Sequence, residues 1–108
     1  MICTSLDLYT RKVYFSIMQW TVKLSGKAEK QAVKLPRKVL DALIALMSNI
    51  REAGPVRGNW PNYSRLTGTR HHCHLKQGRP TFVAVWTEDK KTITVEITYA
   101  GTHEKAPY

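Results

Sequence analysis

The period of the hydrophobic positions changes along the chain and marks the elements we expect. Trp20, Val22 and Leu24 alternate with polar residues, which predicts a strand over Gln19–Leu24. Ser25 is a good helix N-cap, so a short helix should follow it. Small or apolar residues of this helix recur at Ala28, Ala32 and Leu35, with Lys27, Lys30 and Lys34 facing outward.

A second helix follows Pro36, a residue that suits the first helical position. Gly54 can adopt the left-handed conformation of a C-cap, and Pro55 prevents the helix from continuing. Because its apolar stripe has helical spacing, we expect the stripe to face the core. The stripe consists of Val39, Leu43, Leu46, Met47 and Ile50, and is widened by Leu40 and Ile44.

The second half of the chain is typical of short strands joined by turns. The predicted strands are Tyr63–Leu66, Arg70–Lys76, Thr81–Thr87 and Thr92–Tyr99, and the segments between them are rich in Gly, Pro or charged residues. The order is a strand, a two-helix hairpin and a three- to four-stranded antiparallel meander. This order predicts a single α+β domain with both helices on one side of the sheet.

Residues 1–17 stand apart, because Met18 opens a segment that would be a natural protein start. We expect the domain to span residues 18–108 and the upstream part to be an extension or a mis-called start. Alternation of Val13, Phe15 and Ile17 would suit an additional strand.

The sequence favours the cytoplasm. Charged residues interrupt any apolar signal-peptide region, and no apolar run has the roughly 20 residues that span a bilayer. In that compartment we expect Cys3 and Cys73 to remain reduced.

The charge points to an anionic partner, since 17 Lys and Arg against 8 Asp and Glu give a formal net charge of +9. Between residues 51 and 79 the only acid is Glu52. Arginine predominates there and is the better bidentate phosphate ligand, although a solvated surface is the alternative. The basic residues of this stretch are Arg51, Arg57, Arg65, Arg70, Lys76 and Arg79.

Histidines concentrate in one predicted strand. Alternation would place Arg70, His72 and His74 on one face, and His71 with Cys73 on the core face. Three interpretations remain open: a zinc site, histidines that only pack in the sheet, and a phosphate-binding surface. No CxxC or HxxxH spacing accompanies the cluster, so we expect no metal.

The last residues add groups capable of acid–base chemistry. RNA cleavage by the 2′-hydroxyl needs a base, an acid and cations that stabilise the crowded phosphorane. His103 and Tyr108 could serve as acid or base. Arg65, Arg70 and Lys105 could supply positive charge.

Aromatic residues in the loop before the strands allow two interpretations. Trp60 and Tyr63 could stack on unpaired bases, or they could close the core under the loop. The residues we expect to bind RNA are Arg57, Trp60, Tyr63, His72, His74, Lys76 and Arg79.

Several segments together resemble RelE-type toxins of the RelE/ParE superfamily, in particular cytotoxic translational repressors. They are Trp20-Thr-Val-Lys-Leu-Ser, Leu35-Pro-Arg-Lys-Val39, Trp60-Pro-Asn-Tyr-Ser-Arg-Leu66, Arg70-His-His-Cys-His-Leu75 and Tyr99-Ala-Gly-Thr-His-Glu-Lys-Ala-Pro-Tyr108. The similarity covers residues 19–108. It implies a microbial-RNase-like sheet with two helices against it, cofactor-free cleavage of mRNA in the ribosomal decoding site, and a cognate antitoxin as partner.

The resemblance also implies roles for individual residues. Arg65 matches a strand cation, and Arg70 falls near the arginine that binds the scissile phosphate, a role that His72 could take instead. His103 follows the strand-ending glycine, where members carry Arg or His. Tyr108 matches a near-terminal tyrosine that stacks on a base or assists proton transfer. Other members inhibit DNA gyrase without cleaving RNA, so a non-enzymatic inhibitor or a simple RNA-binding module remains an alternative.

Overall fold

The structure, a computed structural model, describes residues 19–108. The expectations about residues 1–17, including a mis-called start, an extra strand and the state of Cys3, lie outside these residues. No helix of residues 19–108 is long and apolar enough to cross a membrane.

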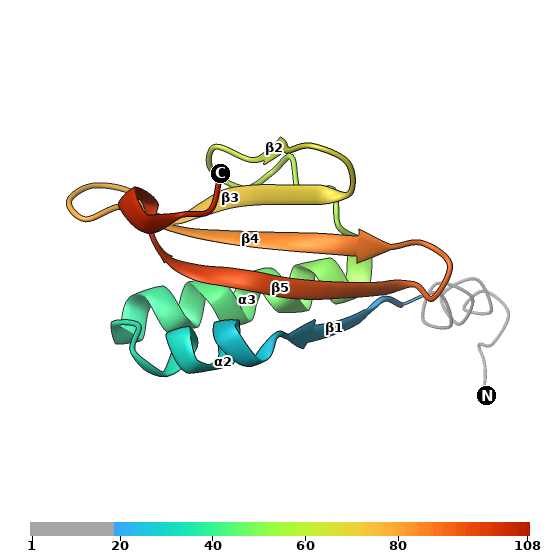
Figure 1. The fold of residues 1–108 in the computed structure, drawn as a ribbon, viewed down its shortest axis with the longest axis horizontal. Helices are drawn as coiled ribbons and strands as arrows, with labels where there is room; N and C mark the ends of the chain where they lie inside the picture. The colour runs from blue at the N-terminus through green and yellow to red at the C-terminus, as the bar shows by residue number, and fades with distance from the viewer. Residues whose placement is uncertain (1–18) are drawn as a thin grey trace, which may run out of the picture.

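The described chain forms the α+β fold expected from the pattern (Figure 1). In chain order the elements are β1 (Thr21–Leu24), α2 (Gly26–Val33), α3 (Arg37–Ala53), β2 (Ser64–Arg65), β3 (Arg70–Lys76), β4 (Phe82–Asp89), β5 (Thr94–Thr102) and a 3-10 turn, η1 (His103–Lys105).

The helix boundaries follow the capping residues. The side chain of Ser25 accepts a hydrogen bond from the backbone N–H of Ala28 at 3.0 Å, as expected for an N-cap. Gly54 ends α3 with φ of 97°, a conformation that favours glycine. Pro36 is the N-cap of α3 and not its first helical residue, so the helix begins one residue later than expected.

The sheet has the order β1-β5-β4-β3-β2. Strands β2 to β5 form the predicted antiparallel meander, and β1 adds to its β5 edge in parallel. The pattern did not predict where β1 pairs, because alternation specifies a face of the sheet and not a neighbouring strand. β2 has two residues where four were expected, since Tyr63 instead closes a turn with its N–H bonded to the carbonyl of Trp60 at 3.2 Å.

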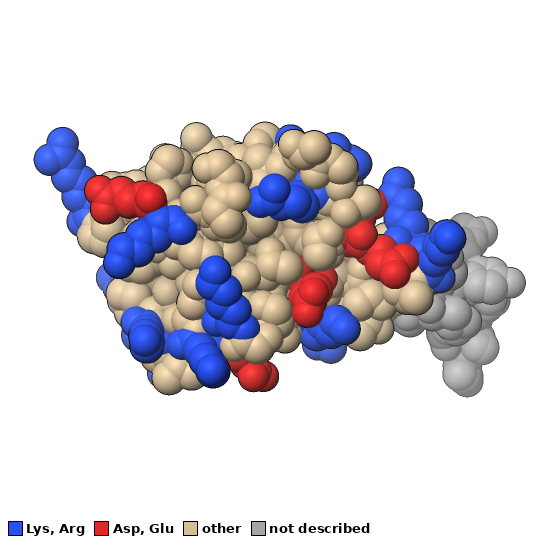
Figure 2. Space-filling model, viewed as in Figure 1, with Lys and Arg blue, Asp and Glu red and all other residues tan. Residues whose placement is uncertain are grey.

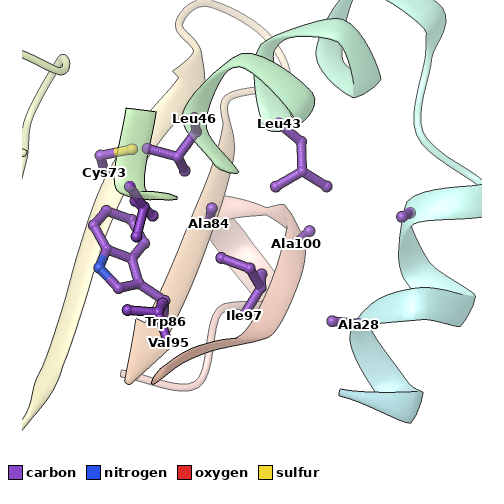
Figure 3. Close-up of a cluster of buried hydrophobic side chains, with 11 residues drawn as sticks. Ala28, Leu43, Leu46, Cys73, Ala84, Trp86, Val95, Ile97 and Ala100 are labelled. Atoms are coloured by element: carbon purple, nitrogen blue, oxygen red, sulfur yellow. The ribbon is translucent and has the colours of Figure 1, made fainter. Parts of the chain in front are cut away.

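Both helices pack on one face of the sheet and enclose the main core (Figures 1 and 3). Leu43 and Leu46 of α3 point toward the small side chains Ala84 and Ala100 and the indole of Trp86. These residues are fully buried or nearly so. The predicted core stripe of α3 is confirmed, except that Ile44 is 56% exposed.

The other face of the sheet carries no helix and is partly covered by the C-terminal tail. Val83, Val85 and Tyr99 form a second buried cluster there, with Ala106 packed against it. The tail therefore turns back after β5 and runs over the sheet toward β3 (Figure 1). This return brings residues far apart in sequence into one site.

Candidate functional site

Four aromatic side chains meet on the helix-free face of the sheet, and we call them the aromatic cluster: His72, His74, His103 and Tyr108. Their ring centroids form a closed circuit. His72 lies 4.6 Å from Tyr108, Tyr108 lies 6.0 Å from His103, His103 lies 5.7 Å from His74, and His74 lies 6.3 Å from His72. β3 supplies two of these rings and the returning tail supplies the other two.

Within the aromatic cluster, His72 contacts the neighbouring strand β2. It is half-buried, and its Nδ1 lies 3.1 Å from the hydroxyl oxygen of Ser64 on β2. Burial lowers the pKa of His72, a hydrogen bond to Ser64 opposes this effect, and the nearby His74 and His103 lower the pKa further. The imidazole is therefore neutral at physiological pH.

His74 lies between His72 and His103 in the circuit. Burial, followed by the proximity of His103, lowers the pKa of His74. Among the described residues, its Nδ1 is buried without a hydrogen-bond partner. Such buried polar atoms without a partner are uncommon in folded proteins.

Arg70 borders the aromatic cluster and contacts the tail. One of its terminal guanidinium nitrogens donates to the backbone carbonyl of Pro107 at 3.2 Å. Strand alternation places Arg70 on the same face as His72 and His74, as the sequence predicted. The site therefore combines a guanidinium, three imidazoles and a phenol, of which Tyr108 has a pKa raised mainly by burial.

On the opposite face, His71 belongs to a buried hydrogen-bonded chain. Its Nε2 lies 2.6 Å from a carboxylate oxygen of Glu88, and its Nδ1 lies 2.7 Å from the hydroxyl of Tyr63. Burial lowers the pKa of His71 more than Glu88 raises it, which favours a neutral ring. A neutral ring satisfies both contacts, since Nε2–H donates to Glu88 and Nδ1 accepts from Tyr63.

The packing interpretation holds for the two loop aromatics. Tyr63 stacks on His71 with centroids 5.9 Å apart and lies against Trp86. Trp60 packs against the main core and donates from its indole nitrogen to Asn49 of α3 at 3.2 Å. Both side chains therefore help to close the core on the helix side and do not join the aromatic cluster.

Two predicted cations also lie away from the aromatic cluster. Arg65 pairs in register with His71, so its side chain belongs to the opposite face of the sheet. Lys105 follows His103 but lines a shallow groove of about 560 Å³ beside α2, together with Lys27 and Lys34. Arg65, which the sequence offered as a source of positive charge for cleavage, therefore lies on the face of the sheet opposite the aromatic cluster.

Of the remaining predicted RNA-binding cations, Lys76 and Arg79 lie near the site and Arg57 lies away from it. Arg79 lines a pocket with His103 at the β3–β4 turn, and Lys76 ends β3 near the same turn. Arg57 bonds to Asn59 and to the carbonyl of Ala53 at the end of α3, on the helix side.

Charge on the viewed face is uneven (Figure 2). Lys and Arg gather over α2 and its end of the molecule, whereas the area over β3 and β4 carries few charged side chains.

Some residues of the site and its support escaped the sequence analysis. Ser64 was not singled out, although the register Ser64↔His72 makes it a direct neighbour. Glu88 was also missed, although alternation from Ala84 and Trp86 places it on the core face beside His71. No group of three or more His, Cys, Asp or Glu side chains in residues 19–108 is arranged to hold a metal ion.

The protein belongs to the α+β class, with a mixed five-stranded sheet, two helices on one face and the C-terminal tail on the other. No protein-family model and no curated protein matches the sequence. Solved structures do match, and several of them are RelE toxins or RelE–RelB complexes.

The isolated RelE toxin of E. coli has a TM-score of 0.63 at 16% identity, over 82% of this chain and 88% of that chain. A chain of the archaeal RelE–RelB complex from Pyrococcus horikoshii has a TM-score of 0.61 at 13% identity, covering 82% of this chain and 99% of its own. The toxin–antitoxin complex RelBE2 of Mycobacterium tuberculosis gives 0.60 at 19% identity, with coverages of 79% and 99%. The chain therefore has the RelE-like toxin fold, as the sequence resemblance implied.

Proposed function

We propose that this protein is the toxin of a toxin–antitoxin pair and acts as a metal-independent endoribonuclease on mRNA. The observation that carries the proposal is the aromatic cluster beside Arg70 on the helix-free face of the sheet. The proposal is supported by the proximity of groups that can act as acid, base and phosphate ligand.

The chemistry is an attack of the ribose 2′-oxygen on the adjacent phosphorus. The new 2′-O–P bond forms as the P–O5′ bond breaks, leaving a 2′,3′-cyclic phosphate and a 5′-hydroxyl. One histidine takes the 2′ proton, and a second group gives a proton to the leaving 5′-oxygen. Arg70 stabilises the charge on the phosphorane, and His103 is placed to serve as the acid.

The cellular target that fits is mRNA held in the ribosome, so that cleavage inhibits translation in the cytoplasm. The net charge of +9 favours association with an RNA-rich partner. We expect the cognate antitoxin to be acidic or amphipathic, since it must neutralise this basic protein. Co-purification of the neighbouring gene product with the tagged toxin tests that expectation.

The experiment is induced expression of the full chain in a bacterium, followed by primer extension on a reporter mRNA. We expect growth arrest with cuts inside translated codons. Both effects should disappear in His103→Ala and Arg70→Ala. Arg37→Ala is the matched control, because Arg37 is exposed on α3 and forms an ion pair with Asp41 at 3.2 Å, away from the aromatic cluster.

Three outcomes would redirect the assignment. Growth arrest with intact mRNA would favour a non-enzymatic inhibitor, of gyrase or of another target. Retained toxicity in both His103→Ala and Arg70→Ala, with folded protein, would contradict the nuclease. An absence of growth arrest would favour an RNA-binding module without catalysis.

A further inference from the structure

We propose that His72 is the general base of the cleavage and that Ser64 is the positioning residue that selects its tautomer. The inference rests on the proposed nuclease function and assigns the 2′ proton to one atom, Nε2 of His72. The sequence had predicted RNA binding for His72 and no role for Ser64.

The sheet register holds Ser64 against His72. The two residues are direct partners across β2 and β3, so their side chains rise from the same face. The hydroxyl oxygen of Ser64 lies 3.1 Å from Nδ1 of His72, a distance at which the ring is held in one orientation. Nδ1 therefore points toward the edge strand β2, and Nε2 lies on the side of the ring away from Ser64.

The proton of His72 belongs on Nδ1. At this distance the hydroxyl of Ser64 can accept a ring N–H from His72. A hydroxyl that accepts a ring N–H also stabilises the protonated imidazole that forms when the base takes up a proton. With Nδ1–H donated to Ser64, Nε2 carries the lone pair, which is the form that a base needs.

The aromatic cluster places the base and the acid apart. His72 and His103 are separated in the circuit of rings by His74 on one side and Tyr108 on the other. A phosphate between the two would meet Nε2 of His72 at the 2′-oxygen and His103 at the 5′-oxygen. His72 gains the proton that the 2′-hydroxyl loses, and His103 supplies the proton that the 5′-oxygen gains, so the step balances without a co-reactant.

The test measures the tautomer and the reaction separately, using the full chain. Long-range ¹⁵N–¹H NMR should show Nδ1–H for His72 in the wild type and a loss of that tautomer in Ser64→Ala. On programmed ribosomes, kcat should fall roughly 10-fold in Ser64→Ala with little change in KM, and Ser64→Thr should restore it.

A matched control is Thr69→Ala, which removes a hydroxyl pair with Thr87 (2.9 Å) just before the start of β3. This variant should keep the wild-type rate and tautomer. An Nε2–H tautomer in the wild type, or an unchanged rate in Ser64→Ala, would overturn the inference. Absence of cleavage by the wild type would overturn the proposed function and with it the role of His72 as base, whereas an unchanged tautomer in Ser64→Ala would overturn the positioning role alone.

Discussion

Nε2 of His71 lies 2.6 Å from a carboxylate oxygen of Glu88, and the two side chains are 0% and 1% exposed. The ammonium group of Lys90 lies 3.7 Å from the second oxygen of this carboxylate. A buried carboxylate needs such hydrogen-bond donors, since an unsatisfied charge in the interior is strongly destabilising. The pair therefore fixes β3 to β4 beside the site.

Removing the imidazole should destabilise the fold. In His71→Leu the Glu88 carboxylate loses its buried donor, and we expect the free energy of unfolding to fall by about 3 kcal/mol. Urea unfolding followed by circular dichroism measures this change. As a control, Asp41→Ala breaks the exposed pair with Arg37 and should cost less than about 0.5 kcal/mol. Equal effects of the two changes would contradict the prediction.

The stability should also depend on pH in a defined direction. The pKa values of His71, His72 and His74 are all lowered below 6.5, with burial as the first cause. Between the unfolded and folded pKa values the unfolded chain binds more protons than the native protein, so stability falls as pH drops. This contribution is complete above pH 6.5 and is lost progressively below it.

We therefore expect the urea midpoint to be constant from about pH 8 to 7 and to decrease from about pH 6.5 to 5. A double variant, His72→Gln with His74→Gln, should show a smaller decrease, because two of the three histidines no longer titrate. A midpoint that rises on acidification over this range would refute the assignment.

The two sides of α3 should differ sharply in their tolerance of substitution. Leu46 is 0% exposed and lies in the main core, whereas Ile44, two residues away, is 56% exposed. Leu46→Ala should lower the free energy of unfolding by about 3 kcal/mol through lost burial and the cavity left behind. Ile44→Ala should change it by less than about 0.5 kcal/mol. Similar losses for both would mean that the helix is oriented differently.

Cys73 should be chemically inert in the folded protein. Its thiol is fully buried in the core, and burial raises its pKa to about 12. The thiolate is the reactive form, so alkylation at pH 8 should be negligible until the protein is unfolded. The measurement is mass spectrometry after iodoacetamide treatment of a Cys3→Ser variant, with and without urea. Rapid labelling without urea would contradict the placement of Cys73.

The sequence predicted those parts of the fold that depend on periodicity and caps. Ala28, Leu43 and Leu46 face the core as their spacing indicated, and Gly54 ends α3. The pairing of β1 with β5 was beyond the pattern, because it depends on contacts between segments more than 70 residues apart in sequence.

The site was predicted only where it depends on alternation within one strand. Alternation placed Arg70, His72 and His74 together, but it could not place Arg65 relative to them, because the register between β2 and β3 was unknown. The contact of Tyr108 with His72 depends on how the tail returns over Val83 and Val85, a tertiary event that local sequence does not encode.

The last prediction separates the ring of Tyr108 from its hydroxyl. The ring lies 4.6 Å from His72 and 6.0 Å from His103, whereas the raised pKa of the phenol keeps it protonated at neutral pH and unsuited to act as a base. If the protein cleaves RNA as proposed, Tyr108→Phe should retain most of the activity, because the ring still packs between the two histidines. Tyr108→Ala should lose roughly 10-fold or more, since both imidazoles lose a neighbour that fixes them. Single-turnover cleavage of ribosome-bound mRNA measures both rates, and circular dichroism confirms folding. A greater loss in the Phe variant than in the Ala variant would instead assign the role to the hydroxyl.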